Sequence, residues 1–184
     1  MIGVDPDGEL YVDSQTGKPL FKPVGNPVKT SHKADPNGNM MQPGYIFTNN
    51  GKPVHALMNT TSDQKWDTDC HGYTFTSGEL WINNKEVPDI IYGDFMSESK
   101  TPKVNDIVIY YTDKKNSQTV EHSMTISRID AKTNDIYVTG LGGLETNAKE
   151  VLITDWSNEY IIYEQPQNID ADPTLQKSLF QQIP

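Results

Sequence analysis

The run "KVNDIVIYYT", residues 103 to 112, has the composition of a buried β-strand. Ile, Val and Tyr fill every position from 107 to 111. β-branched and aromatic side chains favour extended backbone, and an unbroken apolar run is typical of a strand covered on both faces. The chain is therefore expected to contain a sheet with this strand in its interior.

Four further segments downstream have strand character: "EHSMTISRID" (121–130), "NDIYVTG" (134–140), "KEVLITDW" (149–156) and "EYIIYEQ" (159–165). The first of them places His122, Met124 and Ile126 on one face, because side chains alternate along a strand. Together with residues 103–112, these segments predict a meander of about five antiparallel strands.

A short helix is expected before the sheet, in the stretch that begins "DTDCHGYTFTSG" at residue 67. Asp69 is a good N-cap residue, and the apolar positions up to Trp81 lie near helical spacing, which predicts a helix over 69–82. Cys70 then lies in the first turn of this helix. One helix followed by an antiparallel sheet is an α+β arrangement.

Outside the predicted helix and sheet, the chain is polar and rich in turn residues. Residues 1–54 abound in Gly, Pro, Asn and Asp, which predicts an irregular N-terminal arm or linker with at most short strands. Residues 55–165 are expected to form one folded domain, and residues 166–184 a C-terminal tail. His55, at the edge of the arm, is expected to be a solvated side chain without a functional role.

The composition limits the classes of partner. Of the 184 residues, 35 % are hydrophobic and 22 % are charged, which suits one globular domain. Asp and Glu outnumber Lys and Arg by 25 to 15, so the formal net charge is −10, which disfavours nucleic acid as a partner. No apolar run reaches the roughly 18 to 20 residues of a membrane span, so no membrane-spanning segment is expected.

The single cysteine, Cys70, is a candidate nucleophile. At a helix start it would lie near unpaired N–H groups, which favour a thiolate and can hold an oxyanion. The expected oxyanion hole consists of the backbone N–H groups of Cys70 and His71. The His71 side chain would point about 100° away from the thiol, so His122 is the better candidate for the base. The alternative is that Cys70 is a small core residue.

A third polar group is needed to orient the imidazole of the base. The sequence offers Asp135 and Thr139 on the next strand, and Glu145 and Asn147 in the loop "GLGGLETNAKE". The chain has neither the Cys and His spacing of a zinc site nor a Gly-rich nucleotide-binding motif, so no metal and no cofactor are expected.

The order "DCHG", then "KVNDIVIYY", then "EHSMTISRID" resembles the papain-like superfamily of NlpC-type and CHAP-type cysteine hydrolases, over roughly residues 60–150. The resemblance implies a papain-like fold in which the nucleophile helix packs on the sheet. It also implies Cys70 as the nucleophile, His122 as the base and, by loose analogy, Asn147 as the third member. Asn105 stands where the family usually has the Gly of a Gly-Asp turn.

A second resemblance concerns "VDPDGELYVD", residues 4–13, which is similar to the junction that follows the core of Rhs-repeat proteins. It implies a C-terminal toxin domain that is secreted or delivered to a target cell within a larger bacterial protein. A cognate immunity protein would then be a partner. The papain-like resemblance implies hydrolysis of an amide bond, with peptidoglycan peptides as the substrate of an antibacterial effector.

Two alternatives to a peptidase or amidase stay open at this point. A transglutaminase or a protein deamidase toxin would use the same Cys70 and His122 pair on a glutamine side chain. A non-catalytic binding module of a secreted or surface protein would instead keep Cys70 as a buried, unreactive core residue.

Overall fold

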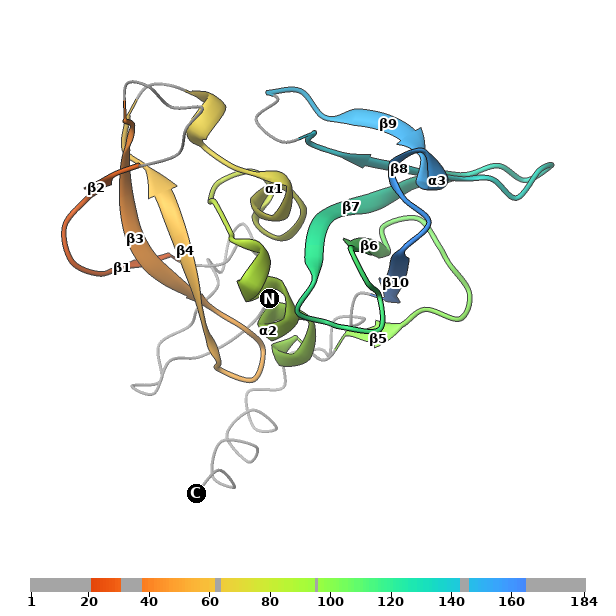
Figure 1. Cartoon of the computed structure of the whole chain (residues 1–184), viewed down its shortest axis with the longest axis horizontal. Coiled ribbons are helices and arrows are strands. Elements are labelled where there is room, and N and C mark those ends of the chain that lie inside the picture. The colour runs from red at the N-terminus through yellow and green to blue at the C-terminus, as the bar shows by residue number, and fades with distance from the viewer. Residues whose placement is uncertain (1–20, 31–37, 62–63, 95, 143–145, 165–184) are drawn as a thin grey trace, which may run out of the picture.

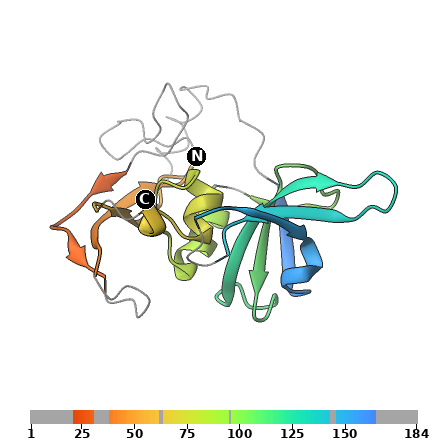
Figure 2. The same cartoon turned by 90° about the horizontal axis from the view of Figure 1, so that it is seen from above.

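The computed structural model describes residues 21–30, 38–61, 64–94, 96–142 and 146–164. These residues form two antiparallel sheets with two short helices between them (Figure 1). Viewed from above, the larger sheet lies on one side of the helices and the smaller sheet on the other (Figure 2). The α+β class expected from the sequence is therefore confirmed.

The elements in chain order are β1 (Lys22–Pro23), β2 (Val28–Lys29), β3 (Met40–Phe47), β4 (Pro53–Asn59), the 3₁₀ turn η1 (Gln64–Trp66), α1 (Cys70–Thr76), the 3₁₀ turn η2 (Asn84–Glu86), α2 (Val87–Gly93), β5 (Ser97–Glu98), β6 (Ile107–Tyr111), β7 (Val120–Ile129), β8 (Ile136–Gly140), β9 (Lys149–Leu152), α3 (Ile153–Trp156) and β10 (Tyr160–Glu164).

The larger sheet has the strand order β5-β10-β6-β7-β8-β9. Strands β6 to β9 follow one another as a meander, as predicted. β10 departs from the predicted meander because it returns to pair with β6, where Ile161 lies opposite Ile109. Every residue of β6 is buried. Because β10 and β7 pair with β6 on either side, both edges of this apolar strand are covered.

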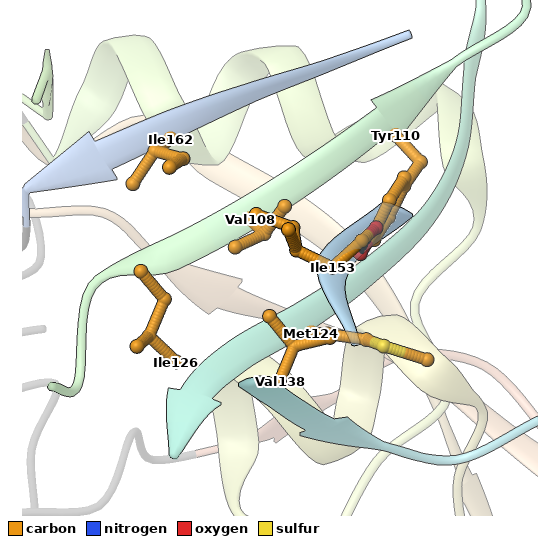
Figure 3. Close-up of a cluster of buried hydrophobic side chains, with 7 residues drawn as sticks. All are labelled: Val108, Tyr110, Met124, Ile126, Val138, Ile153 and Ile162. Atoms are coloured by element: carbon orange, nitrogen blue, oxygen red, sulfur yellow. Dashed lines mark hydrogen bonds between the residues drawn. The ribbon is translucent and has the colours of Figure 1, made fainter. Parts of the chain in front are cut away.

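Each face of the larger sheet has its own core. One face carries the cluster drawn in Figure 3, which consists of Val108, Tyr110, Met124, Ile126, Val138, Ile153 and Ile162. The opposite face carries Ile107, Ile109 and Tyr111, which pack against Val87 of α2 and Phe75 of α1. The prediction that His122, Met124 and Ile126 share a face is confirmed, because His122 lies opposite Tyr110 and against its ring. Helix α1 therefore lies on the face opposite the Figure 3 cluster.

The prediction of an irregular arm over residues 1–54 is wrong from β3 onward. β3 and β4 pair along their lengths, and Ile46 and Val54 are fully buried in a cluster against the segment after α1. The turn residues that suggested an arm include Gly51, whose φ of 79° closes the hairpin between these strands. The rest of the predicted arm is described only in part, because residues 1–20 and 31–37 lie outside the described residues. The predicted tail, residues 166–184, lies wholly outside them.

Helix α1 is shorter than the predicted helix over 69–82. It ends where Ser77 and Gly78 take φ angles of 56° and 86°, in the left-handed region. The chain beyond is extended, and Trp81 exchanges backbone hydrogen bonds of 2.8 and 3.0 Å with Leu57 of β4. The apolar residues after the helix therefore complete the smaller sheet instead of continuing α1.

The segment predicted as one strand over 149–156 is divided into β9 and α3. The carboxylate of Asp155 accepts a hydrogen bond from the N–H of Leu152 at 3.3 Å, which stabilises the first turn of the helix. None of the helices in the described part of the chain combines the length and apolar composition needed to cross a membrane.

Candidate functional site

Cys70 is the first residue of α1, as predicted, and Asp69 is the N-cap. The Asp69 carboxylate accepts hydrogen bonds from the N–H of Gly72 at 2.7 Å and from the N–H of Ile82 at 3.2 Å. These bonds satisfy a free donor of the helix and tie its start to the smaller sheet.

Cys70 packs against β7, where its carbonyl oxygen lies within hydrogen-bond distance of Oγ of Ser123, at 3.3 Å. Its side chain is only 8 % exposed. The N–H groups of Ser123, His71 and Cys70 itself all favour the ionised form of the sulfur. Ser123 follows His122 in β7, so the fold brings the nucleophile candidate beside the backbone of the base candidate. The predicted N–H groups of Cys70 and His71 are at the thiol, and sequence reasoning missed that of Ser123.

The electrostatics differ from the sequence-based expectation of a thiol with a lowered pKa. Burial raises the pKa of Cys70 to about 12, and the nearby carboxylate of Asp69 adds to the rise. Burial also raises the pKa of Asp69 to about 7, against the effect of its backbone hydrogen bonds. Because loss of hydration outweighs the N–H groups of one short helix, the resting thiol is neutral.

His122 lies in β7 and is 3 % exposed. Its Nε2 atom has no hydrogen-bond partner among the described residues. Burial lowers the pKa of His122 to about 4, and the neighbouring His71 lowers it further, so the imidazole is neutral at neutral pH. The imidazole packs with Tyr110 and Trp156 on the Figure 3 face of the sheet, whereas α1 packs on the opposite face, and no hydrogen bond joins the thiol to the ring.

Among the described residues, no hydrogen bond joins His122 to Asn147, Asp135 or Thr139, three of the four candidates for the third catalytic position. Asn147 is exposed in the loop after β8, and Asp135 is exposed in the turn before β8. Thr139 is half-buried in β8 opposite another threonine. Glu145 lies outside the described residues.

The imidazole of His122 is instead covered by Trp156, a contact that sequence reasoning missed. The two rings are stacked, with centroids 4.0 Å apart and planes at 14°. Trp156 remains 46 % exposed, although it is the largest kind of apolar side chain. In the sequence, the only sign of this contact is a tryptophan among polar residues, in "TDWSNE" after β9.

His71 is fully buried and uses both ring nitrogens. Nδ1 lies 2.8 Å from Oγ of Ser123, and Nε2 lies 3.1 Å from Oδ1 of Asn84. Burial lowers the pKa of His71 to about 4, against the hydrogen bond to Asn84. The side chain therefore points to β7 and not to the thiol, which agrees with its exclusion as the base.

No group of three His, Cys, Asp or Glu side chains among the described residues is placed to hold a metal ion. The site is therefore described by its thiol, its two imidazoles and its backbone donors.

The fold and the site together define an α+β protein in which a helix with a buried cysteine packs against a sheet strand with a buried histidine. Comparisons with known protein families, with curated protein sequences and with solved structures find no match for this chain. What the site can do therefore follows from its own residues.

Proposed function

We propose that this chain is a papain-like cysteine hydrolase that cleaves an amide bond, with Cys70 as the nucleophile and His122 as the base. The observation that carries the proposal is the packing of Cys70 against β7 beside the backbone of His122, where the Cys70 carbonyl oxygen lies within hydrogen-bond distance of Oγ of Ser123, at 3.3 Å. The buried, unpartnered Nε2 of His122 supports it. A buried polar group without a partner costs about 1–3 kcal/mol, so a role as proton acceptor would account for its retention.

The neutral state of both groups sets the order of proton transfers. As the Cys70 sulfur attacks the carbonyl carbon, its proton passes to His122 and the carbonyl oxygen becomes an oxyanion. The N–H groups of Cys70, His71 and Ser123 are available to stabilise that oxyanion. His122 then gives its proton to the leaving amine as the C–N bond breaks. Water hydrolyses the thioester in a second attack, with His122 again as the base.

The proton transfer requires the imidazole to come within hydrogen-bond reach of the thiol, directly or through one water. Catalytic hydrogen bonds of this kind often tighten only when the substrate is bound. Because the imidazole packs on the Figure 3 face and α1 on the opposite face, the proposal includes a rearrangement at β7 that brings the ring and the thiol to the same side when substrate binds.

The proposed substrates are peptidoglycan stem peptides, and the proposed setting is a secreted or delivered antibacterial effector with a cognate immunity protein. Both follow from the sequence resemblances. The net charge of −10 disfavours a polyanion such as nucleic acid as the substrate.

Stem peptides incubated with the protein and analysed by liquid chromatography and mass spectrometry test the proposal. We expect wild type to release cleaved peptides, and Cys70→Ala and His122→Ala to lower the rate at least ~10³-fold. His55→Ala removes an imidazole of β4 that packs against Tyr45 in the smaller sheet, and should leave the rate unchanged. Full activity in Cys70→Ala would overturn the proposal.

A non-catalytic binding module is the second candidate, because the burial and raised pKa of Cys70 also suit a core residue. Slow alkylation of the resting thiol is expected in both cases, so peptide cleavage or acyl transfer to Cys70 is needed to separate them. A protein deamidase would be recognised by a mass increase of about 1 Da on a target glutamine, since an acid replaces an amide.

A further inference from the structure

We propose that His71 is a positioning residue: its hydrogen bonds to Ser123 and Asn84 connect α1 to β7, a connection called the clip below, and hold Cys70 beside the backbone of His122. The role in catalysis rests on the proposed function, whereas the clip itself is a property of the fold. The inference starts from a fully buried imidazole, next to the nucleophile candidate, whose two nitrogens both have partners.

The hydrogen bonds of Asn84 fix the proton on His71. The Asn84 amide group donates from Nδ2 to the carbonyl oxygen of Val120 at 2.8 Å, so its Oδ1 atom is turned toward the imidazole. An amide oxygen can only accept, and His71 must therefore donate to it from Nε2. In the neutral ring, Nδ1 is then an acceptor.

Ser123 is the donor to that acceptor. Its hydroxyl group has one proton and three neighbours, namely Nδ1 of His71 at 2.8 Å, Oγ1 of Thr74 at 3.0 Å and the carbonyl oxygen of Cys70 at 3.3 Å. The shortest of these is the bond to His71. Thr74 donates to the Cys70 carbonyl at 2.9 Å, so every member of the network has a partner.

The two attachment points of the clip on β7 lie on either side of the base. Val120, reached through Asn84, precedes His122, and Ser123 follows it. On α1, the ring belongs to the residue after Cys70. One buried side chain therefore fixes the backbone of both proposed reacting residues, and a fully satisfied buried network is rigid.

Two variants break the clip at different points. His71→Ala removes the ring, and Asn84→Ala removes its outer partner from the protein surface. We expect α1 to loosen in both, so that water reaches the thiol and its pKa falls toward the ordinary value of about 8.5. The rate of Cys70 alkylation by iodoacetamide at pH 8 should rise at least tenfold in His71→Ala and less in Asn84→Ala.

The catalytic arm uses the same variants on stem peptides. Misplacement of the nucleophile should lower kcat of His71→Ala at least tenfold with little change in KM. His71→Asn supplies an acceptor for Ser123 and should restore part of kcat and part of the protection from alkylation. His55→Ala should match wild type in both measurements, and circular dichroism confirms which variants are folded.

Unchanged alkylation and unchanged kcat in folded His71→Ala would overturn the inference, and if that variant does not fold, Asn84→Ala and Ser123→Ala decide in the same way. Cleavage that needs Cys70 but not His71 would overturn the inference alone. Faster alkylation without any peptide cleavage by wild type would support the clip and overturn the proposed function.

Discussion

The chemistry of single residues at this site is governed by burial. The thiol of Cys70 and the imidazoles of His71 and His122 are all kept neutral by loss of hydration, and Asp69 is buried beside them. The resting site therefore contains no thiolate–imidazolium ion pair between Cys70 and His122. Its proton transfers would begin only when a substrate supplies the carbonyl group that the sulfur attacks.

Asp69→Asn is predicted to lower the pKa of Cys70. The asparagine oxygen still accepts hydrogen bonds from Gly72 and Ile82, but the charge that raises the pKa of the thiol is removed. Alkylation of Cys70 by iodoacetamide between pH 7 and 10 should therefore become faster than in wild type. An equal or slower rate in the variant would contradict this explanation.

The same variant is predicted to change how stability depends on pH. The pKa of Asp69 is raised from 3.8 to about 7, so the folded state is stabilised below pH 3.8 and loses that stability as pH rises through 7. Each pKa unit corresponds to about 1.4 kcal/mol. Urea denaturation should show that the advantage of Asp69→Asn over wild type grows from pH 4 to pH 8, and an advantage that shrinks over this range would refute the assignment.

Trp156→Ala is predicted to raise the pKa of His122 from about 4 toward 6.5. Burial is the largest cause of the low pKa, and the indole covers one face of the ring. The titration of His122 followed by NMR checks this, with Trp156→Phe as the control that keeps an aromatic ring in place. A pKa that stays near 4 without the indole would show that Trp156 is not the cover.

Sequence reasoning could find Cys70 and Asp69 because a helix cap is a local pattern. It could not find Ser123 or Trp156 as neighbours of the pair, since both come from elements that only the folded chain brings together. The sign of the thiol pKa shift was missed for the same reason, because burial is a property of the packed structure.

Among the elements, α1 packs unusually closely against its neighbouring segments at Gly72. A Cβ atom at Gly72 would overlap the carbonyl oxygen of Leu80 and the hydroxyl group of Thr68. The helix therefore approaches the segment after it through a position that has no side chain.

Gly72→Ala is predicted to destabilise the protein by about 3 kcal/mol, the upper part of the range for overpacking, because the overlapping atom is backbone and cannot move away. Gly25→Ala is the matched control. It places the new methyl group in open space, and its left-handed φ of 65° should cost only about 1 kcal/mol. Urea denaturation measures both, and equal effects would contradict the close approach.

The strands β6, β7 and β8 could be predicted nearly to their ends, because Val, Ile and Tyr alternate or cluster there. The helix prediction ran too far because Leu80 and Trp81 have helical spacing, whereas their pairing with β4 depends on a strand that is distant in the sequence. The division of residues 149–156 into β9 and α3 depends on Asp155, a short-range signal that the apolar run concealed.

At the scale of the whole molecule, the smaller sheet is part of the folded unit. Ile46 of β3 packs in one cluster with Leu80, Ile82 and Ile90, which belong to α2 and to the segment after α1. The helices are thus covered by a sheet on both sides, and the site depends on both.

Ile46→Ala is predicted to destabilise the whole fold by about 2–5 kcal/mol, because its side chain is fully buried. Val28→Ala, at a side chain that is 51 % exposed on β2, should change stability by less than about 0.5 kcal/mol. Denaturation followed at once by far-ultraviolet and near-ultraviolet circular dichroism should give one transition for each. A wild-type-like stability of Ile46→Ala would restore the interpretation of this region as an arm.

The smaller sheet could not be predicted because its turns dominate the local composition. Short strands separated by Gly, Pro and Asn are indistinguishable from an irregular arm until their long-range partners are known. The class of the fold was within reach because the apolar strands downstream are unambiguous.

The most direct test of the central claim is the formation of a thioester on Cys70. The protein would be mixed with an activated ester of a short acyl-alanine peptide, and the acylated residue identified by intact-mass measurement and peptide mapping. We predict an acyl group on Cys70 in wild type, acquired at least ~100-fold more slowly in His122→Ala and at the wild-type rate in His55→Ala. An unmodified Cys70, or one acylated equally fast without His122, would contradict the assignment of this pair.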